Sequence, residues 1–369
     1  MQGKGKRYDL AVVGAGVIGL ACAWRAAQAG LGVVVLERDE PGAGASGVAA
    51  GMLAPVTEAD FGEYELLALN LESRGLWPGF AAELEELTGL PTRFAEPGAL
   101  VVATDRDDSE ELRRLHQLQQ RLELDAEWLA PRAARRLEPG LSPRIAGAIS
   151  VPGEASVDPS AVVIALHTAL RSAGGELRTH AEVTSLDSAG GRVTGLRLAG
   201  GQAVAADSVV MSAGAWSGEG EMGIETVAPE VRPVKGQLLE LRVRRGQSLP
   251  AERLIRTPRC YVVCRRGGSV VVGATMEEQG FDTAVTAGGV LGLLEAAYEV
   301  LPDTAELELV NARAGLRPFT PTGEPVIEAG AIEGLVWATG HGRNGVLLAP
   351  VTARRVLGLV RGRARVESA

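Results

Sequence analysis

The feature that most constrains the fold is the order of apolar runs and glycines at the start of the chain. A strand-like run, DLAVV at 9–13, precedes GAGVIG at 14–19, and an apolar run at 33–36 is followed by Glu37. Strand, glycine turn, helix, strand and acid thus follow one another within one βαβ unit, which predicts a dinucleotide-binding segment. The alternative is an ordinary glycine-rich turn, because GxGxxG alone is a weak signal in a chain with 48 glycines.

Each glycine of this turn has an expected role. Gly14 is expected to form the tight turn, Gly16 to let a pyrophosphate approach the backbone, and Gly19 to let the helix pack closely on the strand. The pyrophosphate would lie at the N-terminus of a helix that begins near Val17. Glu37 would accept a hydrogen bond from a ribose hydroxyl. NAD and FAD fit this pattern equally well.

Length and charge limit the other possibilities. A chain of 369 residues has room for about two domains at ~100–200 residues each. The net charge is −9, and no block of lysines or arginines occurs, so we expect neither nucleic acid nor a membrane as a partner. The basic residues 1–7 precede only a strand-length apolar run, which predicts neither a signal peptide nor an anchor and favours a cytoplasmic protein.

The cysteines and histidines predict no metal site and no disulfide. Cys22, Cys260 and Cys264 have no CxxC spacing, so we expect buried thiols. The four histidines lack metal-ligand spacing; they are His116, His167, His180 and His341.

Hydrophobic periodicity and turn residues divide the chain into helices and strands. Helices are expected at 63–87, as two helices or one helix broken near Pro78, and at 109–124, 159–170, 287–300 and 346–360. Asp158 and Pro159 are expected to cap and begin the helix at 159–170. Strands are expected at 99–103, 145–151, 182–186, 192–198, 203–205, 207–211, 231–243, 253–255, 260–265 and 270–272.

Strands and helices alternate at both ends of the chain, around a β-rich middle, which predicts a discontinuous cofactor domain. We expect an α/β plus α+β fold. A Rossmann-like domain would comprise residues 1–80, 145–220 and 310–369. A substrate-binding domain with a mostly antiparallel β-sheet would comprise residues 81–144 and 221–309.

The C-terminal segment repeats the pattern of the N-terminus. Residues 336–350 read VWATGHGRNGVLLAP, which predicts a strand, a glycine loop and a helix start. Its small residues allow a helix N-terminus to approach a phosphate or an electron-rich ring. The alternative is a routine connection between a strand and a helix.

Six separated motifs resemble the FAD-dependent family that contains D-amino acid oxidase, sarcosine oxidase and glycine oxidase. Within this family the chain looks most like glycine oxidases of the thiamine-biosynthesis type. The motifs are AAGMLAP at 49–55, GAWS at 214–217, PVKG at 233–236, VGATM at 272–276, AGLRP at 314–318 and GHGRNGVLLAP at 340–350.

The resemblance implies that the Rossmann-like domain binds FAD noncovalently across the two glycine loops. The residues it implies for FAD binding are Gly14, Gly16, Val17, Ile18, Gly19, Glu37, Arg38, Ser46, Ala50, Gly51, Met52, Val183, Ala213, Gly214, Trp216, His341, Gly342, Arg343, Asn344, Gly345, Val346 and Leu347. It also implies a homo-oligomer, in the family a tetramer.

The resemblance places three residues at the substrate. Arg317 matches an arginine that binds the substrate carboxylate, and a guanidinium suits this role because it donates two charge-assisted hydrogen bonds. Tyr261 matches a tyrosine that orients the carboxylate, and Met276 matches an apolar wall over the substrate. The alternatives are a surface arginine and ordinary sheet core for the other two.

Three further residues have open roles. Arg343 matches a second basic residue near the flavin. Arg259 stands where some glycine oxidases have a histidine, two residues before the tyrosine. Lys235 either promotes oxygen reduction over the flavin or has a structural role at a strand end, which the PVKG setting favours.

The implied reaction is oxidation of glycine or another small amine by hydride transfer from Cα to flavin N5. The imine would hydrolyse to glyoxylate and ammonia, or supply thiazole synthesis in thiamine biosynthesis, and O2 would be reduced to hydrogen peroxide. No enzyme base is needed if the amine arrives neutral, so orientation supplies much of the catalysis. Alternatives are an oxidase or dehydrogenase for sarcosine, proline or D-amino acids, and a noncatalytic dinucleotide-binding protein.

Overall fold

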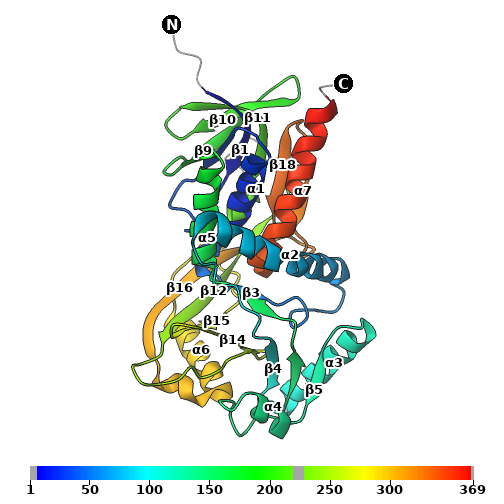
Figure 1. Ribbon diagram of the computed structural model, residues 1–369, viewed down its shortest axis with the longest axis vertical. Coiled ribbons are helices and arrows are strands. Elements are labelled where there is room, and N and C mark those ends of the chain that lie inside the picture. The colour runs from blue at the N-terminus through cyan, green and yellow to red at the C-terminus, as the bar shows by residue number, and fades with distance from the viewer. Residues whose placement is uncertain (1–5, 219–227, 367–369) are drawn as a thin grey trace.

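Two eight-stranded sheets lie one above the other along the long axis of the molecule (Figure 1). The structure is a computed structural model, and it describes residues 6–218 and 228–366. The expected boundary between 220 and 221 therefore lies outside the described residues. None of the described helices is both long and apolar enough to cross a bilayer.

The first sheet has a parallel core that begins with the predicted βαβ unit. Its strand order is β18-β11-β1-β2-β8, and the hairpin β9–β10 and the edge strand β17 are antiparallel additions. Strands buried on both faces read as continuous apolar runs, as β2 and most of β18 do. The bounds are β1 Arg7–Val13, β2 Val33–Leu36, β8 Glu176–Arg178, β9 Val183–Ala189, β10 Arg192–Leu198, β11 Ala203–Met211, β17 Val326–Ala329 and β18 Leu335–Thr339.

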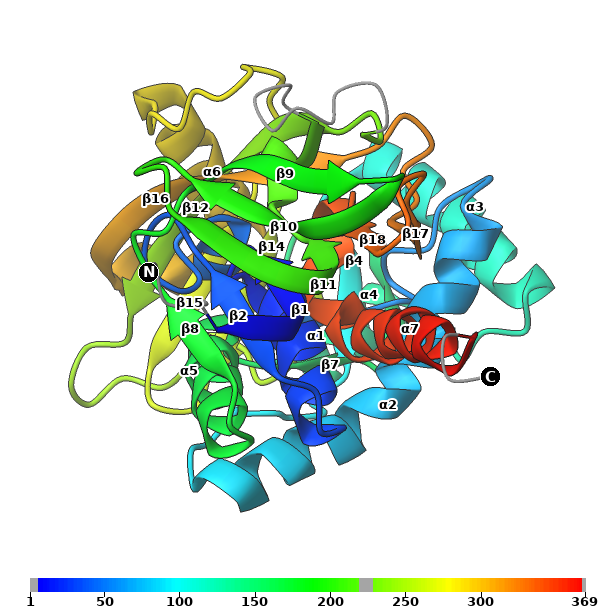
Figure 2. The same cartoon turned by 90° about the horizontal axis from the view of Figure 1, so that it is seen from above.

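Helices cover one face of this sheet, and the β9–β10 hairpin lies over the other face (Figure 2). The helices α1 (Val17–Gln28), α5 (Pro159–Ser172) and α7 (Gly345–Val366) pack side by side. Successive side chains of β1 point to opposite faces of the sheet. Leu10 and Val12 pack against the helices, and Ala11 and Val13 pack under the hairpin. The Asp158 side chain accepts from the N–H groups of Ser160 and Ala161, which confirms the predicted start of α5.

The second sheet is mostly antiparallel. Its order is β16-β12-β15-β14-β13-β4-β6-β5, and only the β13–β4 pair is parallel. The predicted fold class is therefore confirmed. The bounds are β4 Ala99–Ala103, β5 Glu127–Leu129, β6 Gly147–Val151, β12 Arg232–Arg242, β13 Leu254–Arg256, β14 Tyr261–Arg265, β15 Ser269–Gly273 and β16 Glu308–Phe319.

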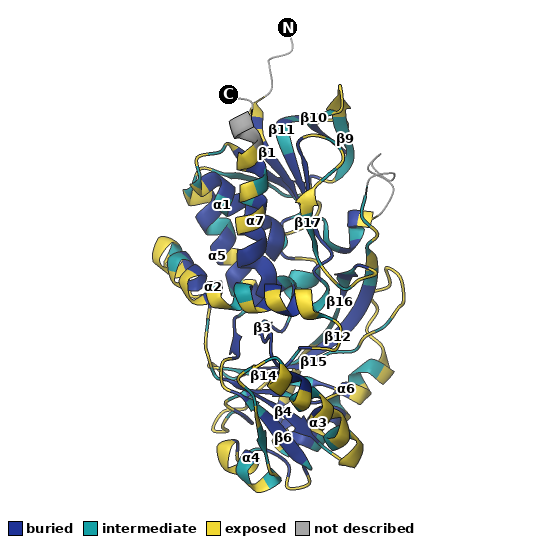
Figure 3. Ribbon diagram, turned by 90° about the vertical axis from the view of Figure 1, so that its right-hand side faces the viewer, coloured by how far each residue is buried: buried dark blue, intermediate teal, exposed yellow. Residues whose placement is uncertain are grey.

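Helices α3 (Arg106–Arg121), α4 (Pro131–Leu137) and α6 (Ala287–Val300) surround the second sheet. Figure 3 shows buried residues in the two sheets and in α1 and α7, and exposed residues on the outer side of α3 and α4. Two short strands, β3 (Met52–Leu53) and β7 (Ala155–Ser156), pair between the two large sheets. Short 3₁₀ turns at Ala45–Val48, Gly214–Gly218 and Gly342–Asn344 carry residues of the predicted site.

The helix at 63–87 was expected to break near Pro78, but α2 (Tyr64–Thr88) runs through it as one helix. Packing on both sides of the proline explains the difference. Trp77 and Phe80 are buried with their rings 5.4 Å apart, and Trp77 Nε1 donates to the carbonyl of Leu347 in α7. The packing of these aromatic side chains outweighs the lost helical hydrogen bond.

Two segments expected in the cofactor domain belong to the second sheet. The segments 147–151 and 310–319 were expected in the cofactor domain, but they form β6 and most of β16, which pair in the second sheet. The predicted strands 203–205 and 207–211 form one strand, β11. The division of the chain into two domains stays a prediction.

Candidate functional site

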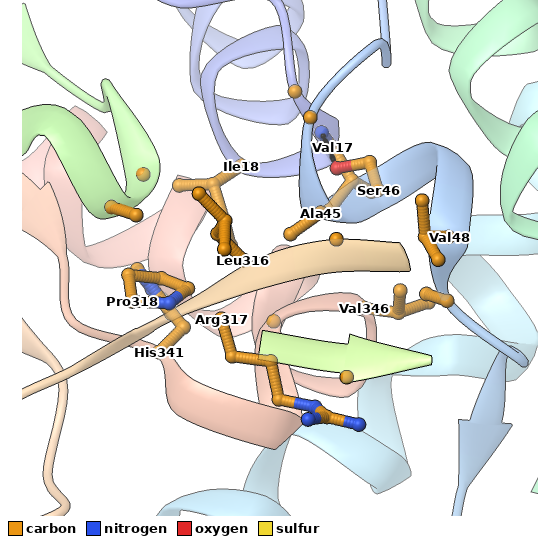
Figure 4. A pocket seen from close by; sticks show the side chains of 18 of the residues that line it. Val17, Ile18, Ala45, Ser46, Val48, Leu316, Arg317, Pro318, His341 and Val346 are labelled. Carbon is orange, nitrogen blue, oxygen red and sulfur yellow. Dashed lines mark hydrogen bonds between the residues drawn. The ribbon is translucent and has the colours of Figure 1, made fainter. Parts of the chain in front are cut away.

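A cavity of about 560 Å³ extends from the glycine turn of the first sheet to the face of the second sheet. Figure 4 shows Val17 and Ser46 on one side of it, with the Arg317 side chain extending from β16 on the opposite side. Most of the predicted site residues line it: Gly14, Gly16, Val17, Ile18, Glu37, Arg38, Ser46, Ala50, Gly51, Met52, Val183, Ala213, Gly214, Trp216, Tyr261, Met276, Arg317, His341, Gly342, Arg343, Gly345 and Val346.

The geometry of the glycine turn matches the roles expected for its residues. Gly14 has a φ of +96°, and a Cβ there would lie 2.6 Å from the carbonyl oxygen of Ser212. A Cβ on Gly19 would lie 2.0 Å from the carbonyl oxygen of Gly14, so the helix packs directly on the turn. Gly16 has only Ser46 Oγ near its Cβ position and faces the cavity. A flat or anionic group therefore has access to the backbone at Gly16.

Glu37 is fixed beside this turn at the end of β2. Its Oε2 accepts from the N–H of Ala15 at 2.6 Å, and its Oε1 accepts from the N–H of Asp39 at 3.0 Å. Carboxylate oxygens have further lone pairs, so a ribose hydroxyl still finds an acceptor. The N–H of Val17 donates to Ser46 Oγ at 2.9 Å, the hydrogen bond drawn in Figure 4.

Arg38 and Trp216 line the same end of the cavity and stack on each other. The Arg38 guanidinium lies 3.9 Å from the centre of the Trp216 ring. The Phe281 ring also contacts Trp216, with 5.7 Å between the two ring centres. Phe281 is part of the segment 274–286 between β15 and α6, called the strap below. No pattern in the sequence indicated this contact.

The C-terminal glycine loop contributes a neutral histidine. Burial lowers the pKa of His341 to about 3, and its Nε2 lies 3.0 Å from the hydroxyl of Thr352. Asn344 and Leu347, expected among the cofactor-binding residues, are buried and do not line the cavity. Leu347 packs in the core under α2, where its carbonyl accepts from Ser73 and Trp77.

Arg317 and Tyr261 reach the opposite end of the cavity over two glycines. A Cβ on Gly236 would lie 2.3 Å from Arg317 Nη1, and a Cβ on Gly273 would lie 2.3 Å from the Tyr261 hydroxyl. Arg317 Nη1 donates to the carbonyl of Thr275 at 3.1 Å. Burial raises the pKa of Tyr261 to about 12, so its hydroxyl stays a hydrogen-bond donor at neutral pH.

The chain matches the family model described as FAD dependent oxidoreductase over residues 9–358. The chain belongs to this family. It is 36% identical to the glycine oxidase of Geobacillus kaustophilus, over 96% of this chain and 93% of the relative. It is 35% identical to the bifunctional protein ThiO/ThiG of Trichormus variabilis, over 94% of this chain and 51% of that protein. A crystal structure of the Geobacillus kaustophilus glycine oxidase has a TM-score of 0.90 at 34% identity, with 96% of this chain and 95% of that chain covered.

The cofactor of this FAD-dependent oxidoreductase is therefore FAD, and the cavity suits it. The glycine turn leaves backbone accessible at Gly16, and Glu37 provides an acceptor. The loop at 340–345 faces the same cavity from the other end of the chain. A dinucleotide cofactor thus finds both predicted loops on one cavity.

Arg343 lines the cavity, but its charge is neutralised by the protein. Its Nη2 lies 2.6 Å from Glu63 Oε2, and its Nε lies 3.5 Å from Glu58 Oε2. Burial opposes the charge of Arg343, but these carboxylates raise its pKa overall. Arg259 also lines the cavity and forms an ion pair with Glu299.

The positions of Met276 and Lys235 bear on the alternative roles given for each. Met276 is 64% exposed at the rim of the cavity, so it is not sheet core. Lys235 is 1% exposed and is absent from the cavity lining. Its ammonium lies 2.8 Å from Asp282 Oδ2 and 3.6 Å from Glu277 Oε2, both in the strap. This supports the structural alternative for Lys235.

Cys22 and Cys260 are buried, as expected, and Cys264 is partly buried. The three cysteines are unpaired, and burial raises the pKa of Cys22 and of Cys264 to about 12. Cys260 lines the cavity. No cluster of metal-ligating side chains occurs in residues 6–218 and 228–366.

Four charged residues of the cavity lining were missed: Asp39, Glu58, Glu182 and Arg256. Glu58 and Arg256 both line it near Tyr261 and Arg317. Neither lies in one of the glycine turns, and one arginine among many has no distinguishing pattern in the sequence. Only the pairing of the strands brings Arg256 next to Tyr261.

Proposed function

We propose that this FAD-dependent oxidoreductase oxidises glycine and other small amino acids. The observation that carries the proposal is the state of Arg317. Its guanidinium lines the cavity, donates to backbone carbonyls, and has no carboxylate within ion-pair distance among the described residues. A half-buried cation without a counter-ion favours an anionic ligand, and a carboxylate matches a guanidinium in shape.

The residues around Arg317 would orient an amino acid. Arg317 would bind the carboxylate, and the neutral Tyr261 hydroxyl would donate to it. Met276 at the rim would limit the access of water. Bound FAD supplies the acceptor for the two electrons removed from the amino acid. An amino acid that binds with a neutral amine needs no protein base to lose its Cα hydrogen, so its orientation carries much of the catalysis.

The products would be an imine and, after reoxidation by O2, hydrogen peroxide. Hydrolysis of the glycine imine would release glyoxylate and ammonia. Similarity to ThiO/ThiG supports a role of the imine in thiazole synthesis for thiamine. Noncovalent FAD, a cytoplasmic location and a homo-oligomer, in the family a tetramer, complete the proposal.

Anaerobic mixing with glycine tests the proposal. Bleaching of the oxidised flavin band is expected, and readmission of air should then yield hydrogen peroxide. A panel of glycine, sarcosine, proline and D-alanine would rank the substrates, and dye reduction without peroxide would identify a dehydrogenase. A flavin spectrum unchanged by every amine of the panel would contradict the proposal.

A further inference from the structure

A buried guanidinium lies just outside the cavity, at the end of β14. Arg265 projects to the same face of the sheet as Tyr261, because the two are four residues apart on one strand. Its side chain is only 14% exposed and does not line the cavity. Its Nη2 donates to the carbonyl of Ala50 at 2.7 Å. Arg265 therefore reaches from the second sheet to the segment 49–52, which carries three of the predicted FAD-binding residues.

The charge of Arg265 is only partly compensated. In the part of the chain that the structure describes, its nearest carboxylate is Asp158, whose Oδ2 lies 4.0 Å from Arg265 Nη1 and 3.8 Å from Arg93 Nη1. The Nε of Arg265 is buried and has no hydrogen-bond partner among the described residues. Burial lowers the pKa of Arg265, but an arginine stays charged at neutral pH. A buried charge that is poorly paired lowers stability, so a role other than stability accounts for it better.

The peptide group between Ala50 and Gly51 links this charge to the cavity. The peptide is trans, so its C=O and N–H point in opposite directions. The carbonyl of Ala50 points to Arg265, and the N–H of Gly51 therefore points away from it. Gly51 is buried and lines the cavity, and its N–H has no acceptor among residues 6–218 and 228–366. Buried N–H groups are almost always paired, so this one is available to a ligand in the cavity.

The segment 49–52 lies near the substrate end of the cavity. Met52 and Tyr261 pack on the same apolar cluster. Hydride transfer requires the flavin ring to lie beside the amino acid that Arg317 and Tyr261 would bind. The part of FAD that meets Gly51 is therefore the flavin ring rather than the adenosine.

The segment is also held on its other side. Met52 pairs with Ser156 in the short β3–β7 ladder, and the carbonyl of Gly51 accepts from the N–H of Val157 at 2.9 Å. Arg265 and β7 thus fix the Ala50–Gly51 peptide from two directions.

We propose that Arg265 raises the reduction potential of bound FAD through the Ala50–Gly51 peptide. Its hydrogen bond holds this peptide with the Gly51 N–H directed at the flavin ring, and its charge strengthens that N–H as a donor. Reduction adds electrons to the ring, so a donor and a positive charge beside it favour the reduced form. Arg265 touches neither the cavity nor the substrate, and it is a positioning residue. This inference rests on the proposed function, which places the flavin ring at this end of the cavity.

The midpoint potential of the FAD-loaded protein tests the inference, and its measurement needs no amino acid. Titration with dithionite in the presence of a reference dye reports the potential from the flavin absorbance. Arg265→Met removes both the charge and the donor. It should weaken the binding of reduced relative to oxidised FAD about tenfold, which corresponds to a potential about 30 mV lower for a two-electron couple. Arg265→Lys keeps the charge and should restore most of the potential.

Arg253→Met is the matched control. Arg253 also donates to a backbone carbonyl, that of Leu137, and it has a carboxylate partner in Glu138. Neither Arg253 nor Leu137 lines the cavity. The control should therefore keep the potential of wild type, whatever its effect on stability.

Asp158→Asn should shift the potential in the opposite direction. Asparagine caps a helix as well as aspartate does, so the start of α5 is preserved. The substitution removes the negative charge that partly offsets Arg265, and the potential should rise. This variant decides the question even if Arg265→Met retains no FAD.

A potential of Arg265→Met equal to that of wild type would overturn the inference. So would an equal fall in Arg253→Met, or a potential that does not rise in Asp158→Asn. Failure of every amine to bleach the flavin would instead contradict the proposed function, and the potentials would still report on Arg265.

Discussion

At the scale of single residues, the site depends on glycines that make room for long side chains. The Arg317 guanidinium lies where a side chain at position 236 would begin, and the Tyr261 hydroxyl lies where one at position 273 would begin. The glycines of the PVKG and VGATM motifs, Gly236 and Gly273, therefore contribute to the site because they have no side chain.

Arg317→Ala should raise the KM for glycine at least tenfold and leave FAD binding intact. Hydrogen bonds to charged groups contribute about 1.5–3 kcal/mol, and about 1.4 kcal/mol corresponds to tenfold in affinity. Steady-state kinetics and flavin titration would measure the two effects. Arg313→Ala is a control on the same strand, since Arg313 pairs with Glu240 and does not line the cavity. An unchanged KM in Arg317→Ala would refute its role in binding the carboxylate.

At the scale of elements, two loops hold the substrate end of the cavity in place. The strap is joined to β12 by backbone hydrogen bonds between Lys235 and Glu277 and by the ion pair of Lys235 with Asp282. Its Thr275 carbonyl accepts from Arg317. The loop at 54–58 is held by Glu154, whose Oε1 accepts from the N–H groups of Val56 and Thr57.

Lys235→Met should raise the KM for glycine several-fold, because the strap would lose the ion pair that holds the Thr275 carbonyl beside Arg317. The hydrogen bond to Asp282 raises the pKa of Lys235, so the ammonium is charged at neutral pH. Lys235→Arg keeps the charge and should restore most of the affinity. Equal KM values for Lys235→Met and wild type, with a lowered melting temperature, would show that the ion pair affects stability alone.

Glu154 should make the protein less stable as the pH rises from 5 to 8. Burial raises the pKa of Glu154 from 4.5 to about 8, so the folded chain keeps a proton that the unfolded chain releases. The free energy of unfolding then falls with rising pH, by at most about 1.4 kcal/mol per pH unit. Denaturant unfolding of wild type and Glu154→Gln across this range would measure the difference. The Gln variant should have the shallower slope, and parallel slopes would contradict the prediction.

At the scale of the whole molecule, local patterns in the sequence predicted individual helices and strands more reliably than they predicted which strands pair. The glycine turn, β2 and α6 follow from periodicity and turn residues alone. β16 was missed because the residues 308–319 include Asn311, Gly315 and Pro318, which local propensity disfavours in a strand, and pairing with β12 decides its state. Arg256 was missed for a related reason. Only the pairing of β13 with β14 places it opposite Tyr261, and no local pattern indicates that pairing.

Residues from both ends of the chain line the cavity proposed for FAD, so FAD binding should stabilise the whole fold. At free FAD one hundred times above Kd, ligand linkage adds about 2.7 kcal/mol to the free energy of unfolding. The melting temperature of wild type should therefore rise by several degrees when FAD is added.

Gly16→Ala is the informative variant, because Gly16 has an ordinary φ and only Ser46 Oγ near its Cβ position. Its methyl group should leave the apo melting temperature close to that of wild type and abolish most of the increase with FAD. Gly14→Ala, with a positive φ and a backbone oxygen 2.6 Å from the added Cβ, should instead lower the apo melting temperature itself. An equal increase with FAD in Gly16→Ala and wild type would show that the pyrophosphate does not approach the chain at this glycine.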